Sequence, residues 1–275
     1  MDYNNLSLFS RPKPFQMGTL TLWSNEYIAN SVLKKHIDDS IDSGSRKLAT
    51  IERSSEWIVK KSSHNPDILD IGCGPGLYGN KFSTMVNSYD GIDISPYQIS
   101  YAKKHNESKT NVTYYVCDFR KWNVEKTGKK YDSVLLMYAV YSFYNFDERI
   151  NLLREIRKSL KQNGIVIIEV FTSKHYEHRS DITDWRYVDK NGFWLPDPYI
   201  ELNSFMKYSD DLILIQAGII EKRIYIWNSW IQLFDVSSLK YELSLAGFTK
   251  YQWYGSCCGD HFSSDSEVLC ACAGF

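Results

Sequence analysis

The stretch Asp70-Ile71-Gly72-Cys73-Gly74-Pro75-Gly76-Leu77-Tyr78-Gly79 decides how this chain folds. It follows the short apolar run Asp67–Ile71, which is typical of a buried strand, and its glycines let the backbone turn tightly. A helix that begins at the end of such a turn directs its N-terminal N–H groups at whatever lies beside the turn. The spacing Gly74-x-Gly76-x-x-Gly79 also fits the dinucleotide fingerprint, so the turn alone leaves the ligand open.

The same strand–helix alternation continues along the chain. Buried strands are expected at four further places, residues 89–94, 112–117, 131–137 and 164–171. The clearest helices lie between them at 95–105 and 147–162, and the second ends at the C-cap signal Asn163-Gly164. This alternation predicts an α/β fold, a doubly wound, Rossmann-like parallel sheet with helices on both faces.

The remaining segments follow other patterns. Two helices are expected within residues 24–62, with a break at 43–45, and successive strands are expected within 199–234. We therefore expect four parts: an N-terminal helical segment (1–65), a Rossmann-like cofactor-binding core (66–174), a β-rich insertion that caps the substrate site (175–235) and the C-terminal part of the core (236–275). A helix at 237–246 and two strands, near 248–254 and 267–272, end the chain.

Composition and charge limit the kinds of partner that this chain is expected to bind. Lys and Arg number 32 against 33 Asp and Glu, and no basic block occurs, so we expect no nucleic-acid partner. The N-terminus has no leader pattern and no stretch approaches 18 apolar residues, so we expect no membrane association. Six cysteines form no Cys-x-x-Cys pair, which favours reduced thiols and a cytoplasmic protein. His175 and His178 lack companion ligands, so no metal site is expected.

Acidic residues stand where the next two strands end. Asp93 ends the second strand, where a carboxylate can accept from both hydroxyls of a ribose. Asp118 ends the third strand and is followed by Phe119, so a carboxylate could accept from an exocyclic amine while the ring packs on a purine. A site rich in carboxylates suits a cationic ligand better than a pyrophosphate. Taken singly, each aspartate is also an ordinary residue for a strand end.

Set in order, these motifs resemble the class I S-adenosylmethionine-dependent methyltransferases. The residues that carry the resemblance are Asp70-x-Gly72-x-Gly74-x-Gly76, Gly91-Ile92-Asp93-Ile94-Ser95, Cys117-Asp118-Phe119, Tyr131–Leu136 and Leu160-x-x-x-Gly164. The resemblance runs from about residue 45 to the C-terminus, and is greatest to bacterial, small-molecule-type members (methyltransferase type 11/12-like) whose substrates are uncharacterised. It implies a seven-strand sheet with the last strand antiparallel, and S-adenosylmethionine as cofactor.

The resemblance also implies roles for individual residues. It implies that Asp93 holds the ribose and that Gly72, Gly74 and Gly76 line the methionine part of the cofactor. Asp118 and Phe119 would hold the adenine, and Met137 and Tyr138 would lie beside the sulfonium. Arg46 would pair with the cofactor carboxylate as a bidentate fork. The motifs place four more residues in the cofactor site: Asp70, Cys73, Ile94 and Gln98.

The leading hypothesis is transfer of a methyl group to a small molecule by in-line displacement. The cofactor carries the activated group, so the protein supplies mainly alignment and a dry site, and a base is needed only if the acceptor arrives protonated. By location, the candidates for that base are Tyr141, Tyr144 and His175, which border an aromatic-rich substrate entrance. Base methylation of nucleic acids is disfavoured, because Met137-Tyr138-Ala139-Val140-Tyr141 replaces the Asn/Asp-Pro-Pro-Tyr/Phe motif and no Pro-Cys pair occurs.

Two other functions remain open at this level. An NAD-dependent oxidoreductase would use Gly74-x-Gly76-x-x-Gly79, and a regulatory module would hold the cofactor without turnover. The sequence also leaves open the methyl acceptor, the oligomeric state, and whether the insertion is a lid or a dimer surface.

Overall fold

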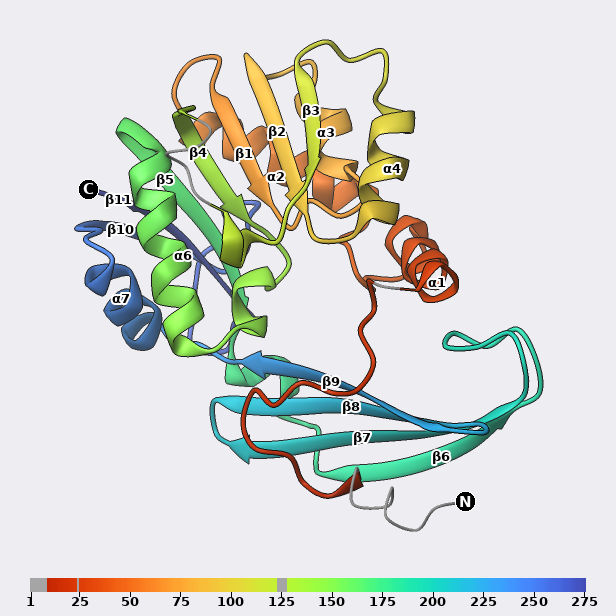
Figure 1. The fold of residues 1–275 in the computed structure, drawn as a ribbon. Helices are drawn as coiled ribbons and strands as arrows, with labels where there is room; N and C mark the ends of the chain where they lie inside the picture. The colour runs from red at the N-terminus through yellow and green to blue at the C-terminus, as the bar shows by residue number, and fades with distance from the viewer. Residues whose placement is uncertain (1–8, 24, 123–127) are drawn as a thin grey trace.

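The computed structural model describes residues 9–23, 25–122 and 128–275, and two sheets organise them (Figure 1). The larger sheet has seven strands in the order β10-β11-β5-β4-β1-β2-β3. Their bounds are β1 (Asp67–Ile71), β2 (Ser88–Asp93), β3 (Val112–Val116), β4 (Tyr131–Leu136), β5 (Leu160–Phe171), β10 (Lys250–Tyr254) and β11 (Val268–Gly274). Strands β1 to β5 pair in parallel, whereas β11 runs antiparallel to both β5 and β10. The predicted seven-strand sheet with an antiparallel last strand is confirmed.

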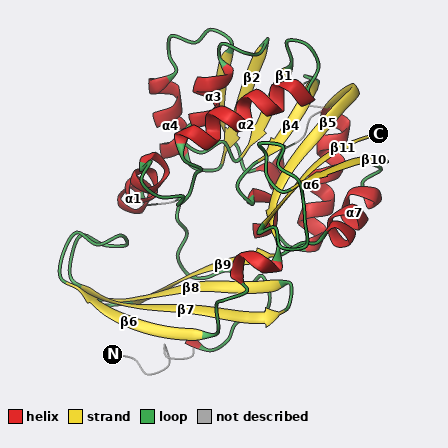
Figure 2. Ribbon diagram, turned by 180° about the vertical axis from the view of Figure 1, so that it is seen from behind, coloured by secondary structure: helices red, strands yellow, loops and turns green. Residues whose placement is uncertain are grey.

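Helices cover both faces of this sheet (Figure 2). They are α1 (Glu26–Ile37), α2 (Leu48–Lys61), α3 (Leu77–Phe82), α4 (Pro96–His105), α6 (Phe146–Ser159) and α7 (Val236–Leu245). Successive side chains of a strand point to opposite faces, so Ile68 packs in the cluster with α2, α3 and α4, whereas Leu69 packs in the cluster with α6 and α7. Within the described ranges, no helix is both long and apolar enough to cross a bilayer.

The helix expected at 147–162 ends earlier than its sequence pattern indicates. α6 stops at Ser159, and Leu160 already begins β5, where it pairs with Tyr131. The next partners are Ser133 and Ile165, so the intervening residues of β5 form a bulge. Asn163, at a φ of +69°, therefore marks this bulge and not a helix C-cap.

A second sheet lies across from the carboxyl ends of the parallel strands (Figure 1). It contains β6 (Ile182–Val188), β7 (Tyr199–Ser209), β8 (Leu212–Ile220) and β9 (Ile224–Gln232), each antiparallel to the next, as expected for the region after residue 175. Residues 9–20 run along this sheet, where the Leu20 N–H donates to Ile226 O (2.9 Å) and Trp230 Nε1 to Gln16 O (2.9 Å). The insertion returns to its starting point, because the Phe234 N–H donates to Phe171 O (3.0 Å).

One buried ion pair ties α6 to α7. Arg149 Nη2 lies 2.6 Å from Glu242 Oε1, Arg149 Nε lies 2.9 Å from Glu242 Oε2, and the Tyr141 hydroxyl also donates to that carboxylate. All three side chains are buried. A buried pair of this kind destabilises the fold when one partner is removed, because the other charge stays unpaired.

We expect Glu242→Ala to lower the free energy of unfolding by about 3–5 kcal/mol, measured by urea denaturation. Glu177→Ala is the control, since its ion pair with Lys174 lies at the surface, and it should change stability little. Equal effects of the two substitutions would contradict a structural role for the buried network.

Candidate functional site

The glycine turn between β1 and α3 is packed so that only glycine fits at key positions. Gly72, Gly74 and Gly76 have φ values of +80°, +52° and +77°, which residues with a Cβ rarely adopt. A Cβ at Gly72 would lie 2.8 Å from Val140 Cγ2, and one at Gly76 would lie 2.5 Å from the Tyr114 hydroxyl. The turn is thus fixed between the loop after β4 and the sheet.

Asp93, at the end of β2, holds the turn from the side. Its Oδ2 accepts from the Gly74 N–H (3.0 Å), and its Oδ1 accepts from the Ser95 N–H (2.8 Å). Burial raises the pKa of this carboxyl. Each carboxylate oxygen can accept more than one hydrogen bond, so Asp93 keeps capacity for ligand hydroxyls.

Two predicted residues lie beneath the turn. Asp70 is 2% exposed, and its Oδ2 accepts from the Tyr89 hydroxyl at 2.6 Å. Burial raises the pKa of Asp70 to about 7. Burial also raises the pKa of the Cys73 thiol well above its ordinary value. Both side chains therefore support the turn from the interior of the sheet.

Gln98 and Ile94 follow Asp93 in the chain. Ile94 is half-buried, whereas Gln98 in the first turn of α4 is fully buried. Gln98 Nε2 donates to Ala29 O of α1 at 3.4 Å, and its Oε1 has no hydrogen-bond partner within the described residues. A buried amide oxygen without a donor is costly, so Gln98 offers an acceptor to a ligand or a water molecule.

Asp118 and Phe119 adjoin each other at the end of β3, as predicted. Asp118 is the N-cap of the short helix η2 (Phe119–Lys121). Its carboxylate accepts from Arg120, with Nε 2.9 Å from Oδ1 and Nη2 2.7 Å from Oδ2. This pairing with Arg120 lowers the pKa of Asp118. Phe119 is buried and meets the Tyr144 ring edge-on, with ring centroids 4.2 Å apart. Asp118 can thus still accept, but its charge is already compensated.

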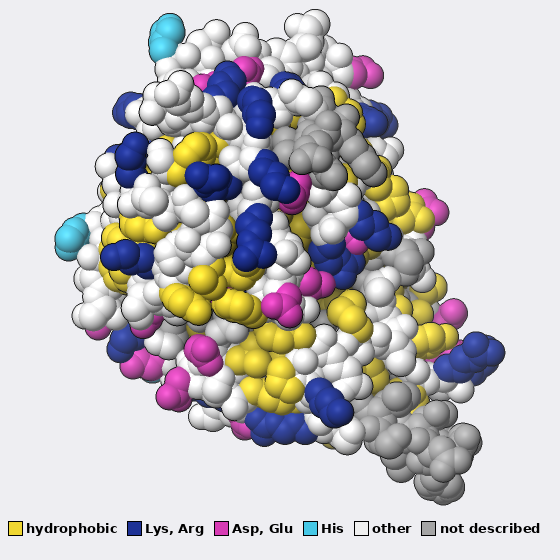
Figure 3. Space-filling view, turned by 60° about the vertical axis from the view of Figure 1, so that its left-hand side comes forward, with side chains coloured by type: hydrophobic (Ala, Val, Ile, Leu, Met, Phe, Trp, Pro, Cys, Tyr) yellow, Lys and Arg dark blue, Asp and Glu magenta, His cyan; other side chains and the backbone are white. Residues whose placement is uncertain are grey.

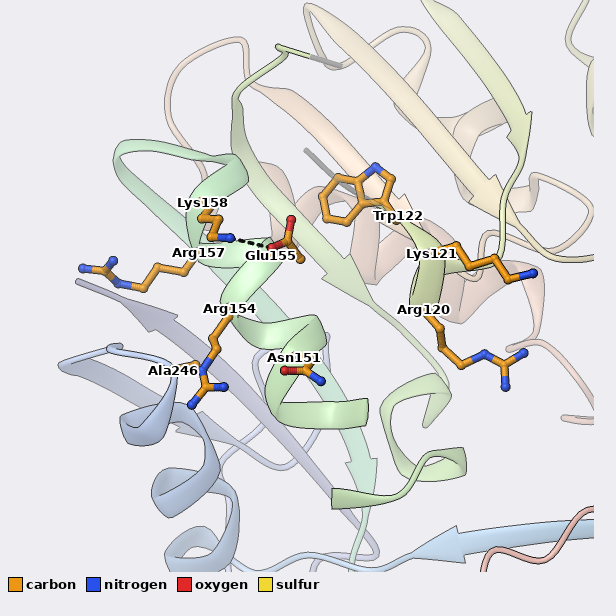
Figure 4. Close-up of a pocket in the computed structure, with 9 residues that line it drawn as sticks. All are labelled: Arg120, Lys121, Trp122, Asn151, Arg154, Glu155, Arg157, Lys158 and Ala246. Atoms are coloured by element: carbon orange, nitrogen blue, oxygen red, sulfur yellow. Dashed lines mark hydrogen bonds and ion pairs between the residues drawn. The ribbon is translucent and has the colours of Figure 1, made fainter. Parts of the chain in front are cut away.

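Arg120 also borders a cavity of about 620 Å³ between η2 and α6 (Figure 4). Basic side chains dominate its lining, among them Lys121, Arg154 and Arg157. Lys and Arg side chains recur across this side of the molecule (Figure 3). Neither the glycine turn nor Asp93 lines this cavity, so it is distinct from the predicted site.

The residues expected beside the sulfonium follow β4. Met137 is buried, and Tyr138 is half-buried beside the guanidinium of Arg46, which lies 4.9 Å from the ring centroid. Arg46 Nη2 pairs with Glu169 Oε1 (2.7 Å), and Nη1 pairs with Asp42 Oδ2 (3.3 Å). Two carboxylates therefore already hold Arg46, and its role toward a cofactor carboxylate stays a prediction.

The three candidate bases lie in different surroundings. His175, in the short helix η4 (Ser173–Tyr176), stacks on Phe171 with centroids 4.0 Å apart, and its Nδ1 lies 3.2 Å from Glu267 Oε2. Burial lowers the pKa of His175, which favours the neutral, proton-accepting ring. Burial raises the pKa of Tyr144, which packs on the predicted adenine residue Phe119. Tyr141 is fully buried in the α6–α7 ion-pair network.

Two further residues lie at this edge to which the sequence analysis assigned no role in the site. His36 lies in the last turn of α1, with its Cε1 3.4 Å from where a Gly74 Cβ would lie, and its Nδ1 is hydrogen-bonded to Ser45 Oγ at 2.7 Å. Burial lowers the pKa of His36 to about 4, so the ring is neutral at pH 7. Glu169 is 3% exposed within the apolar strand β5. A charged residue inside a buried strand was a usable signal, because glutamate is rarely buried unless it is paired.

Comparison with known proteins gives matches to methyltransferases. The model of a methyltransferase-domain family covers residues 68–164. The chain is 31% identical to ubiquinone biosynthesis O-methyltransferase from Pelagibacter ubique, over 58% of this chain and 61% of that protein. It is 30% identical to malonyl-[acyl-carrier protein] O-methyltransferase 1 from Ilyobacter polytropus, over 44% of each. The chain thus matches about three fifths or less of the length of these two relatives.

Solved structures share the fold. An S-adenosylmethionine-dependent methyltransferase from Clostridium acetobutylicum has a TM-score of 0.64 at 13% identity, covering 82% of this chain and 92% of that chain. CalS10, an amino pentose methyltransferase from Micromonospora echinaspora solved with S-adenosylmethionine bound, has a TM-score of 0.53 at 13% identity, covering 93% and 99%. Residues 68–164 of this chain thus match a methyltransferase-domain family, and its fold is shared with solved S-adenosylmethionine-dependent methyltransferases.

Proposed function

We propose that this chain is an S-adenosylmethionine-dependent methyltransferase that acts on a small-molecule acceptor. The observation that carries the proposal is the Asp93 carboxylate, which accepts from the Gly74 N–H of the glycine turn and has free acceptor capacity. S-adenosylmethionine supplies an activated methyl group. The residues present fit this cofactor, since the site combines left-handed glycines, carboxylates for hydroxyl and amine donors, and the unpaired oxygen of Gln98.

Each side chain has a binding task in this proposal. Asp93 would hold the ribose hydroxyls, and Asp118 would accept from the adenine amine beside Phe119. The glycine turn would line the methionine part, closed over by the neutral ring of His36. Tyr138 would border the methyl group, and Arg46 would share its charge between Glu169 and the cofactor carboxylate. The chain itself thus aligns the reactants and excludes water.

The acceptor would lie between the carboxyl edge of the core and the second sheet. We propose that residues 175–235 cap this space. The names of the relatives and of CalS10 support small or carrier-linked acceptors. His175 is the best placed of the three candidate bases, because its pKa is lowered and Glu267 fixes its Nδ1. We also propose that the protein is cytoplasmic and has no nucleic-acid partner.

Ligand binding tests this function directly. We expect S-adenosylhomocysteine to raise the melting temperature of the protein, and NAD⁺ or NADH to leave it unchanged. Stabilisation by the nicotinamide cofactors alone would instead favour an oxidoreductase. Tight binding of S-adenosylhomocysteine with no acceptor methylated in a broad screen would favour the regulatory alternative.

Asp93→Ala should weaken S-adenosylmethionine binding by about 1.5–3 kcal/mol for each charge-assisted hydrogen bond lost to the ribose, measured by calorimetry. Asp184→Ala, an exposed carboxylate on β6, is the control and should bind as the unmodified protein does. Circular dichroism must show both variants folded, because Asp93 also holds Gly74. Unchanged affinity in a folded Asp93→Ala protein would remove Asp93 from the site.

The affinity for S-adenosylmethionine should rise as the pH increases toward about 7. The pKa of Asp70 is raised by burial to about 7 in the free protein, opposed by Tyr89 and reinforced by Asp93. A bound sulfonium cation favours the ionised carboxylate, so binding releases a proton. The affinity for neutral S-adenosylhomocysteine should depend less on pH. In the Asp70→Asn variant, the affinities for the two ligands should show nearly the same pH dependence. Parallel pH curves for the two ligands in calorimetry would contradict this linkage.

A further inference from the structure

The backbone directly after β4 is strained at two adjacent residues. Tyr138 has a φ of +51° and Ala139 a φ of +58°, both in the left-handed region. Residues with a Cβ rarely adopt this conformation, and two in succession are rarer still. Such strain persists only where the surrounding structure holds it, and it concentrates at functional sites.

Glu169 on the neighbouring strand β5 holds both residues of this turn. Its side-chain Oε2 accepts from the Tyr138 N–H at 2.7 Å, and its backbone oxygen accepts from the Ala139 N–H at 3.1 Å. The carboxylate is 3% exposed, so water does not compete for these bonds. One residue thus supplies acceptors to both strained N–H groups.

The second carboxylate oxygen of Glu169 reaches the connection between α1 and α2. Glu169 Oε1 accepts from Arg46 Nη2 at 2.7 Å, and the guanidinium of Arg46 lies over the Tyr138 ring. The Tyr138 hydroxyl in turn donates to Asp42 O at 3.0 Å. Glu169, Arg46 and Tyr138 therefore form a closed set of contacts that joins the α1–α2 connection to the end of β4.

We propose that Glu169 is a positioning residue of the methyltransferase site, which holds the strained turn and Arg46 in the arrangement that presents Tyr138 to the cofactor. The inference rests on the proposed function. Both partners of the carboxylate are donors, an N–H and a guanidinium, so a side chain with two acceptor oxygens is required. Glutamine would direct its NH₂ group at one of these donors and leave a buried group unpaired.

Glu169→Gln tests the proposal by calorimetry with S-adenosylhomocysteine. We expect affinity to fall about tenfold or more, the effect of a lost charge-assisted hydrogen bond. Glu201→Gln is the matched control, because Glu201 is also buried and also accepts from two donors, Trp194 Nε1 and Arg186 Nε, but on the second sheet. The control should lose stability in urea while it keeps its affinity within about twofold.

Ala139→Gly separates positioning from a general loss of stability. Glycine adopts the left-handed conformation without strain, so the measured affinity of Ala139→Gly alone for S-adenosylhomocysteine serves as the reference for the double variant. Combined with Glu169→Gln, it should restore part of the lost affinity, because the turn then needs less support. Recovery of affinity while the urea midpoint stays lowered would identify positioning, whereas affinity and stability that recover only together would indicate a merely structural role of Glu169.

The outcomes are distinct. Unchanged affinity in Glu169→Gln, or a double variant that recovers nothing, would overturn the role of Glu169. If Glu169→Gln does not fold, Glu169→Asp replaces it, since the shorter carboxylate cannot reach Tyr138 and Arg46 together and should show the same loss and the same rescue. If the unmodified protein fails to bind S-adenosylhomocysteine, the proposed function itself is wrong, whatever the variants do.

Discussion

The hydrogen bond from the Gly74 N–H to the Asp93 carboxylate connects the two loops on which the site depends. β1 and β2 are parallel neighbours, so their carboxyl ends meet at one edge of the sheet. The N–H groups of Gly72 and Cys73 both donate to Ile92 O, one residue before Asp93. The glycine turn needs acceptors for these N–H groups, and the half-buried carboxylate of Asp93 needs donors for its charge. Each loop therefore supports the conformation of the other.

The second sheet is attached to the core through packing as well as through the chain. Ile28 and Val32 of α1 share a hydrophobic cluster with Tyr199, Ala217 and Ile219 of the second sheet. α1 also packs on α4, where Gln98 donates to Ala29 O. The aromatic excess follows this architecture. Trp194 and Trp230 are buried in packing clusters, while Trp185 on the edge strand β6 is 70% exposed.

Much of the fold and part of the site followed from sequence patterns, and the failures have physical causes. The strand Asp67–Ile71 and the glycine turn were predictable, because local conformation and burial agree there. The end of α6 was not, since the pairing of Leu160 with Tyr131 overrides a helical pattern that continues to residue 162. Local sequence does not encode which strand lies beside a residue, and that contact decides the helix boundary.

The candidate site divides in the same way. Asp93 and Asp118 stand at strand ends, so the parallel topology alone brings them to one edge. His36 comes from a helix that packs over the turn, and no local spacing predicts that long-range contact. Tyr141 was a reasonable candidate by position, but it faces Glu242 of α7, a partner about 100 residues away whose approach only the tertiary structure shows.

The hydrogen bond from the Phe234 N–H to Phe171 O bears on how proteins with this arrangement of sheets can evolve. Because the chain leaves the core and re-enters it at one point, the antiparallel sheet is a cassette set into a continuous scaffold. A cassette with adjacent ends can be lengthened, exchanged or lost while the strands that flank it keep their register. Under the proposed function, acceptor preference can therefore diversify through the cassette, while the proposed cofactor-binding residues, which all precede it in the chain, stay under separate selection.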